Sequence, residues 1–174
     1  LYNNIQRFEL TGNSDTWLIP STAVDATING GNGLNTIKID SAITGLAYTV
    51  GTGGIILDVL GPNASKQTLS NFEILYGTDA NQQTSATDKV DMNLNDNSTA
   101  SKNLYFILNN GLVDYTGMTN TTSTGVTLNI YTEQMETVGV KSTMRVDKGG
   151  SKDYYFGVTE ITLTGYDDTI KLDI

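Results

Sequence analysis

The sequence contains no cysteine and no histidine. The absence of cysteine excludes disulfide bonds and metal sites built on thiolates. The absence of histidine removes the commonest general base and the commonest ligand of transition metals. Catalytic triads and dyads that use histidine, and zinc sites that use histidine or cysteine, are therefore impossible within this chain.

Basic residues and long apolar runs are also scarce. Ten lysines and arginines stand against 19 aspartates and glutamates, which gives a formal net charge of −9. Such a surface repels the phosphates of nucleic acids and attracts cations, so we expect no nucleic-acid partner. No apolar run approaches the roughly 20 residues that a membrane span needs, so we expect no membrane insertion.

The length of 174 residues fits one domain or one elongated module. The first residues, from Leu1 onward, lack the basic and apolar regions of a signal peptide. We expect residues 1–174 to form a single β-rich module of a longer protein, whose targeting information lies outside this segment.

Alternation of apolar and polar residues dominates the sequence. We interpret each alternating segment as a half-buried strand. The clearest of these segments are residues 36–40, 90–95, 126–131 and 170–174. Two more continuously apolar runs are typical of strands covered on both faces. These runs are residues 55–60 and 104–108.

Turns and helices leave weaker patterns. The segment Lys148-Gly149-Gly150 lies between two apolar stretches and predicts a hairpin turn. The best helix candidate is residues 132–144, but Gly139 and several β-branched residues argue against a long helix there.

An eight-residue word occurs near both ends of the chain. Residues 10–17 and residues 163–170 both follow the pattern LTGxxDT-apolar, and residues 35–40 and, more loosely, 88–91 repeat its second half. Asp15 and Asn35 are 20 residues apart, which is one coil of a solenoid with roughly 20-residue repeats. We therefore predict an all-β fold of parallel, solenoid-like or β-roll-like coils, in which residues 98–157 are the place for an antiparallel insertion.

The residue types of this word suit calcium as well as a simple turn. Calcium takes six to eight oxygen ligands from carboxylates, amides and backbone carbonyls. Glycines in tight turns expose carbonyl oxygens, and an aspartate before the next strand adds negative charge. An aspartate after a glycine is also common in ordinary turns, where its side chain accepts hydrogen bonds from backbone N–H groups. Both roles stay open for this word.

Residues 30–38, GGNGLNTIK, resemble the glycine- and aspartate-rich nonapeptide of RTX proteins, GGxGxDx-apolar-x. In that family, turns of a parallel β-roll bind Ca²⁺ through aspartate side chains and glycine carbonyls. The resemblance implies that Gly31, Gly33 and Asn35 are ligands, with asparagine in place of the family's aspartate. The aspartates in the other copies of the repeated word are added to these candidate ligands. The candidate Ca²⁺ ligands are Asp15, Gly31, Gly33, Asn35, Asp40, Asp88, Asp167 and Asp168.

The rest of the chain, rich in threonine and asparagine, resembles the β-rich bodies of bacterial surface-layer proteins and large adhesins. The two resemblances imply a secreted, calcium-stabilised structural module at the cell surface. Its partners would be neighbouring modules of the same protein, or copies of itself in a lattice. Two alternatives stay open: a carbohydrate-binding β-sandwich whose ligand is a cell-surface glycan, and the non-catalytic region of a secreted hydrolase.

Three glutamates could supply the paired acids of a glycosidase. These are Glu9, Glu73 and Glu160, each of which precedes a copy of the turn. Their place in a repeated strand indicates one structural role used three times, so we expect no enzymatic activity.

Aromatic residues could stack on sugar rings at residues 105–106 and 154–156. Within a strand, however, one member of each pair more often faces the core. Trp17 has the place that Ile170 has in the last copy of the word, which predicts a core residue.

Overall fold

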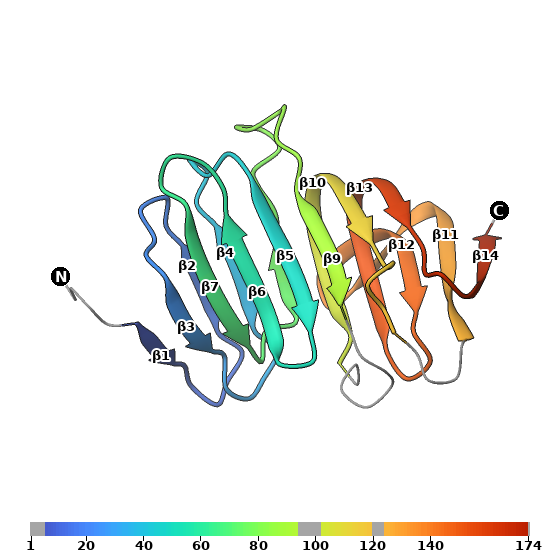
Figure 1. Ribbon diagram of the computed structural model, residues 1–174, viewed down its shortest axis with the longest axis horizontal. Coiled ribbons are helices and arrows are strands. Elements are labelled where there is room, and N and C mark those ends of the chain that lie inside the picture. Colours follow the sequence, from blue (N-terminus) through green and yellow to red (C-terminus); the bar gives the residue numbers. More distant parts are fainter. Residues whose placement is uncertain (1–5, 94–101, 120–123, 174) are drawn as a thin grey trace.

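The computed structural model describes residues 6–93, 102–119 and 124–173 (Figure 1). They form an all-β structure whose strands belong to one mixed sheet that does not close. The strands are β1 (Arg7–Glu9), β2 (Thr16–Ile19), β3 (Ala26–Asn29), β4 (Thr36–Ile39), β5 (Leu46–Gly51), β6 (Gly54–Val59), β7 (Ser65–Ser70), β8 (Ile74–Tyr76), β9 (Lys89–Asn93), β10 (Leu104–Asp114), β11 (Thr124–Thr137), β12 (Val140–Asp147), β13 (Lys152–Thr162) and β14 (Asp167–Asp173). The described part of the chain includes no helix, and therefore none that could cross a membrane.

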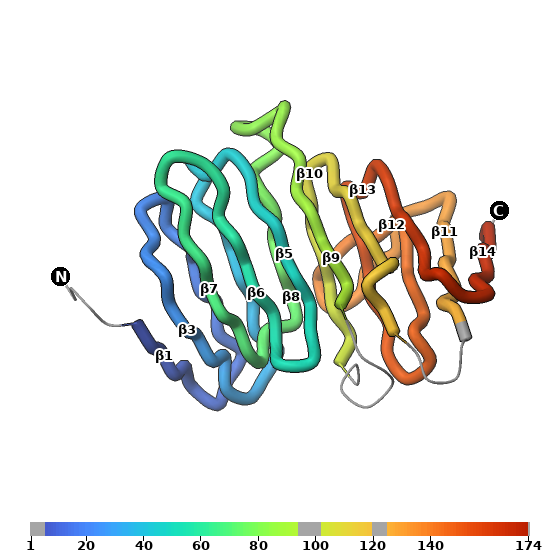
Figure 2. The backbone as a smooth tube through the Cα atoms, viewed as in Figure 1, coloured from blue at the N-terminus to red at the C-terminus, as the bar shows by residue number. Residues whose placement is uncertain are grey.

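The sheet folds back on itself into two facing layers. One layer contains β1, β3, β7, β6, β5 and β9 side by side, and β2, β4 and β8 lie behind it (Figures 1 and 2). β10 and β13 contribute to both layers because each bends midway, near Asn110 (φ 48°) and at Gly157 (φ 76°). β10 consequently pairs with β8 through residues 105–107 and with β9 through residues 112–114.

The first four strands form two parallel pairs with one common offset. β3 pairs with β1 and β4 pairs with β2 at a spacing of 20 residues, as in Phe8–Ile28 and Trp17–Ile37. The period expected from Asp15 and Asn35 is therefore confirmed for this part of the chain. The spacing then widens, and Thr36 pairs with Ile74, because the β5–β6 hairpin is inserted between them.

Antiparallel ladders interrupt the parallel pairing in two places. β5, β6 and β7 form one antiparallel run, so the prediction of parallel coils before residue 98 is wrong there. β11, β12 and β13 form the other, within the segment predicted for an antiparallel insertion. β10 lies in the same segment but pairs in parallel with its neighbours, and residues 98–101 and 120–123 lie outside the described residues.

The two local predictions have different outcomes. The hairpin turn at residues 148–150 is confirmed: it joins β12 to β13, and the Lys148 N–H donates to the Ser151 carbonyl at 3.0 Å. The helix candidate at residues 132–144 is wrong, because this segment forms the outer halves of β11 and β12. Val138 (φ 50°) and Gly139 (φ 76°) make the tight turn between them.

The core lies between the two layers and is filled by alternate residues of each strand. Ile19, Ile37 and Leu75 project into it from one layer, and Ile28, Leu57 and Tyr48 from the other. Residues 104–108 are covered on both faces as predicted, because β10 has the core on one side and Val140 of β12 packs near Tyr105 on the other. Residues 55–60 are not covered on both faces, since the outer face of β6 is only partly buried and Leu60 is exposed.

Candidate functional site

The repeated word folds into the same turn at both of its positions. The Asp15 carboxylate accepts hydrogen bonds from the Thr11 N–H at 3.0 Å and from the Thr11 hydroxyl at 2.7 Å. The Asp168 carboxylate accepts one from the Thr164 hydroxyl, also at 2.7 Å. In both copies, the threonine and the aspartate of LTGxxD thus hold the turn together, which is the ordinary role of an aspartate in a turn.

Successive turns are joined by a row of hydrogen bonds that we call the corner ladder: Asp15, Asn35, Glu73 and Lys102. The Asp15 N–H donates to Asn35 Oδ1 at 2.8 Å, and the Asn35 N–H donates to Glu73 Oε2 at 2.9 Å. Glu73 Oε1 closes the row with an ion pair to Lys102 Nζ at 2.7 Å. Asn35 and Glu73 are buried, so the ladder satisfies backbone N–H groups that the turns would otherwise leave without partners.

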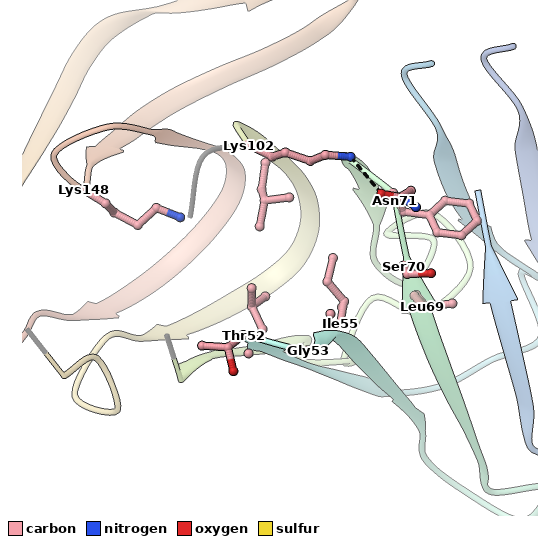
Figure 3. A pocket seen from close by; sticks show the side chains of 13 residues that line it. Thr52, Gly53, Ile55, Leu69, Ser70, Asn71, Lys102 and Lys148 are labelled. Atoms are coloured by element: carbon pink, nitrogen blue, oxygen red, sulfur yellow. Dashed lines mark hydrogen bonds between the residues drawn. The ribbon is translucent and has the colours of Figure 1, made fainter. Parts of the chain in front are cut away.

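A second row runs beside the first and ends on the same lysine. Asn29 Nδ2 donates to Glu9 Oε2 at 2.7 Å, and Asn71 Nδ2 donates to Asn29 Oδ1 at 2.7 Å. Lys102 Nζ donates to Asn71 Oδ1 at 3.2 Å (Figure 3). Hydrogen bonds from Arg7 and Asn29 lower the pKa of Glu9. Both rows keep the strand pairs in register through polar side chains.

The three glutamates do not share one role. Glu9 and Glu73 are members of the two rows, and each accepts hydrogen bonds from the neighbouring strand pair. Glu160 lies exposed on β13, outside both rows. The prediction of one role used three times is therefore wrong: Glu9 accepts from an asparagine side chain, Glu73 accepts from a backbone N–H, and Glu160 belongs to neither row.

Gly31 and Gly33 allow one turn to stack closely on the turn before it. Both have left-handed backbone conformations, with φ of 72° and 102°. A Cβ atom at Gly31 would overlap the Thr11 carbonyl oxygen, and one at Gly33 would lie 2.6 Å from the Asn13 carbonyl carbon. Glycine is needed here for conformation and for close approach, whether or not the turn also binds a cation.

The other predicted ligands lie elsewhere. Asp40 Oδ1 accepts the Ala42 N–H at 2.9 Å in the turn after β4. Asp167 is exposed at the start of β14, and Asp168 accepts the Val126 N–H at 2.8 Å. Because β2 and β14 lie at opposite ends of the molecule, the structure brings Asp15, Gly31, Gly33 and Asn35 together but not Asp15 and Asp168 (Figure 1).

Asp88 joins two segments that are distant in sequence: Thr78, which follows β8, and Asn109 in β10. It is fully buried, and its carboxylate accepts the Asn109 N–H at 2.7 Å together with the hydroxyl and N–H of Thr78. Burial raises the pKa of Asp88, while these hydrogen bonds oppose the rise. The side chain is occupied by protein donors in the same manner as Asp15.

The calcium prediction stays a prediction. Across residues 6–93, 102–119 and 124–173, no three acidic side chains gather closely enough to share a metal ion. An ion held by the described corners would therefore take most of its ligands from backbone carbonyls, amide side chains and water, all of which calcium accepts.

A buried ion pair is a feature that the sequence patterns do not indicate. Lys148 Nζ lies 2.7 Å from Asp153 Oδ1, and the two side chains are 1% and 0% exposed. The Tyr115 hydroxyl donates to Asp153 Oδ2 at 2.6 Å and lies 2.6 Å from the Tyr155 hydroxyl. Burial raises the pKa of Asp153, which the ammonium group of Lys148 opposes, and it raises the pKa of both tyrosines far above the usual value.

A cavity of about 310 Å³ lies next to Lys148, between the β5–β6 turn, the end of β7 and the start of β10 (Figure 3). Lys102 and Lys148 both line it, with Phe72 and Leu104 among the apolar walls. Each of the two ammonium groups has a carboxylate partner, Glu73 for Lys102 and Asp153 for Lys148.

The aromatic pairs face opposite sides of β10 and β13. Phe106 and Tyr155 stack in the core at a centroid distance of 5.1 Å, and Tyr105 stacks on Tyr154 on the other face at 4.9 Å. Tyr105 is itself buried, so Tyr154 and Phe156 are the two of these five aromatic residues that are partly accessible to a sugar. Trp17 is half-buried against Phe8 at the edge of the core, as predicted, with the ring centroids 4.7 Å apart.

The two ends of the molecule expose unpaired strand edges. At one end, β2 pairs with β4 alone among the described strands, and at the other end β14 pairs with β11 alone (Figure 1). The prediction that residues 170–174 form a half-buried strand is wrong in its burial: β14 is exposed along nearly all of its length, with Ile170 61% and Leu172 63% exposed. Residue 174 lies outside the described residues.

Neither a family model, nor a curated protein, nor a solved structure matches the chain.

Proposed function

We propose that this chain is a structural module of a surface-layer or adhesin-type protein, built from solenoid-like coils and stabilised by calcium. The observation that carries the proposal is the corner ladder. It joins Asp15, Asn35 and Glu73 in one row along successive strand pairs, two of which repeat every 20 residues. Repetition of one structural unit along an axis is the design of elongated repeat proteins.

The use of the polar residues supports a structural role. Asp15, Asn35 and Asp88 direct their side-chain oxygens to backbone N–H groups and hydroxyls of the protein. The buried Lys148–Asp153 pair is likewise engaged with protein partners. Groups held in this way maintain the backbone and leave little capacity for acid–base chemistry on a substrate.

Calcium would act on the exposed face of the LTGxxD turns, most directly on the second copy at residues 163–168. Asp167 has an exposed carboxylate next to Asp168 and beside a glycine-containing turn, and the chain as a whole carries a charge of −9. An ion that binds only the folded chain stabilises it by mass action. Export from a calcium-poor cytoplasm to a calcium-rich exterior would then favour folding at the cell surface.

Thermal unfolding tests the calcium proposal directly. We expect the melting temperature in millimolar Ca²⁺ to exceed that in chelator by several degrees, since a ligand at 100 times its Kd adds about 2.7 kcal/mol. Asp167→Asn should reduce this difference, whereas Asp58→Asn, on β6 and outside both copies of the repeated word, should not. A melting temperature that is the same in calcium, magnesium and chelator would remove calcium from the proposal.

A further inference from the structure

The exposed strand β14 presents an unusual apolar surface. Ile170 and Leu172 pair with Leu128 and Ile130 of β11, whose side chains pack in or against the core. Paired residues of parallel strands point to the same face, so Ile170 and Leu172 also face the interior side of the layer. They are nonetheless more than 60% exposed, so no described residue covers this face of β14.

The equivalent strand at the other end of the molecule is β2. In the repeated word, Trp17 takes the place of Ile170, and Ile19 takes that of Leu172. Here the same two positions are half-buried and fully buried, and Phe8 of β1 packs against Trp17 from the facing layer. The interior-facing positions of this word are therefore covered when strands of the facing layer lie across from them.

β2 and β14 also run in the same direction. β2, β4, β8 and the first halves of β10 and β13 are parallel to one another. β12 reverses the direction and β11 reverses it again, and β14 is parallel to β11. The free edge of β14 and the free edge of β2 therefore fit as neighbours in a parallel ladder, and they lie at opposite ends of the long axis (Figure 1).

We infer that β14 of one molecule pairs in parallel with β2 of a second copy of this chain. Thr169 would lie beside the second copy's Thr16, Ile170 beside its Trp17 and Leu172 beside its Ile19, which is the register in which β2 pairs with β4. Each copy keeps one end free, so the contact is head-to-tail and produces open chains of molecules instead of closed dimers. This inference rests on the proposed structural function and names its partner and its contact.

Electrostatics set the conditions for this association. The register places Asp168 beside the second copy's Asp15, and each copy carries a net charge of −9. Repulsion of this kind is screened within about 10 Å at 0.1 M salt, and within shorter distances at higher salt. We therefore expect association to strengthen as sodium chloride is raised, unlike contacts that depend on ion pairs.

The test uses sedimentation velocity together with the fluorescence of Trp17, which is the single tryptophan. In about 0.5 M sodium chloride, where the Debye length is a few ångströms, we expect a series of species that grows with protein concentration. The Trp17 emission should shift to the blue in parallel as β14 of the neighbouring molecule covers the ring. A single monomeric species up to millimolar protein would overturn the inference.

Variants decide which edges meet. Ile170→Lys with Leu172→Lys changes only exposed side chains, and it should weaken self-association at least tenfold without lowering the melting temperature. Leu60→Lys, an exposed apolar residue after β6, is the matched control and should associate like the parent chain. Equal association of the double variant and the parent would overturn the proposed contact.

Mixing separates head-to-tail pairing from pairing between two β14 strands. The double variant keeps an intact β2, so in excess it should cap parent molecules as one-to-one complexes with a blue-shifted Trp17. If two β14 strands met instead, no mixed complex would form, and that result would overturn the inference. Because calcium stabilisation is measured on the monomer, the function proposed above would survive a failure of this contact, and the contact would survive a failure of calcium binding.

Discussion

Replacement of Lys148 by methionine should destabilise the protein by roughly 3–5 kcal/mol, the usual consequence of leaving one member of a buried ion pair without its partner. Lys148 and Asp153 are almost completely buried, and their closest charged atoms are 2.7 Å apart. Methionine fills a similar volume, so loss of packing contributes little. The measurement is chemical unfolding at neutral pH. Lys152→Met, at an exposed lysine in the same hairpin, should change stability by less than about 0.5 kcal/mol.

The pH dependence of this variant identifies the cause of the loss. Burial already raises the pKa of Asp153, and removal of the ammonium group that opposes the rise should raise the pKa further. A carboxyl group whose pKa is higher in the folded state favours folding when protonated, and this contribution is lost as pH increases through the folded-state pKa. The deficit of Lys148→Met relative to the parent should therefore shrink as pH falls toward 4. A deficit that does not change with pH would point to packing instead of the unpaired carboxylate.

The alternation of apolar residues predicts which side chains fill the core, but not which strands become neighbours. Leu46, Tyr48 and Val50 face the core together with Ile55, Leu57 and Val59, and both segments are consistent with a parallel coil or a hairpin. The connecting segment determines whether two such strands pair in parallel or as a hairpin. Residues 51–54 reverse the chain tightly, so β5 and β6 become antiparallel. A glycine-rich segment of similar composition at residues 30–33 connects the two layers instead.

The sequence predicts only part of the candidate site. The spacing of Asp15 and Asn35 predicts that they stack, and Asp15 N–H and Asn35 Oδ1 do meet at 2.8 Å. The partners Glu73 and Lys102 follow at unequal spacings, because the hairpin of β5 and β6 and the segment around β9 are inserted between the corners. No local pattern records such long-range pairings. The same holds for Tyr115 and Asp153, which are 38 residues apart and meet only because β10 and β13 are neighbours.

Replacement of Gly31 by alanine should have the second large effect, because two separate costs act at this position. A left-handed conformation costs a residue with a Cβ atom about 1–2 kcal/mol, and φ at Gly31 is 72°. In addition, the new Cβ atom would overlap the Thr11 carbonyl oxygen, which belongs to the backbone of the preceding turn and cannot move without shifting β1 or β2. We expect a total loss of more than about 2 kcal/mol in chemical unfolding.

Gly12 provides the matched control within the same stack. It lies in the turn that Gly31 packs against, it has no left-handed φ, and a Cβ atom there would meet nothing within 4 Å. Gly12→Ala should leave stability unchanged or raise it by up to about 1 kcal/mol, because alanine restricts the unfolded chain. Equal losses from the two substitutions would mean that glycine serves flexibility in these turns. A loss confined to Gly31→Ala would show that the corners are held at a spacing that only glycine permits, which is also the spacing at which Asn35 reaches the backbone of Asp15.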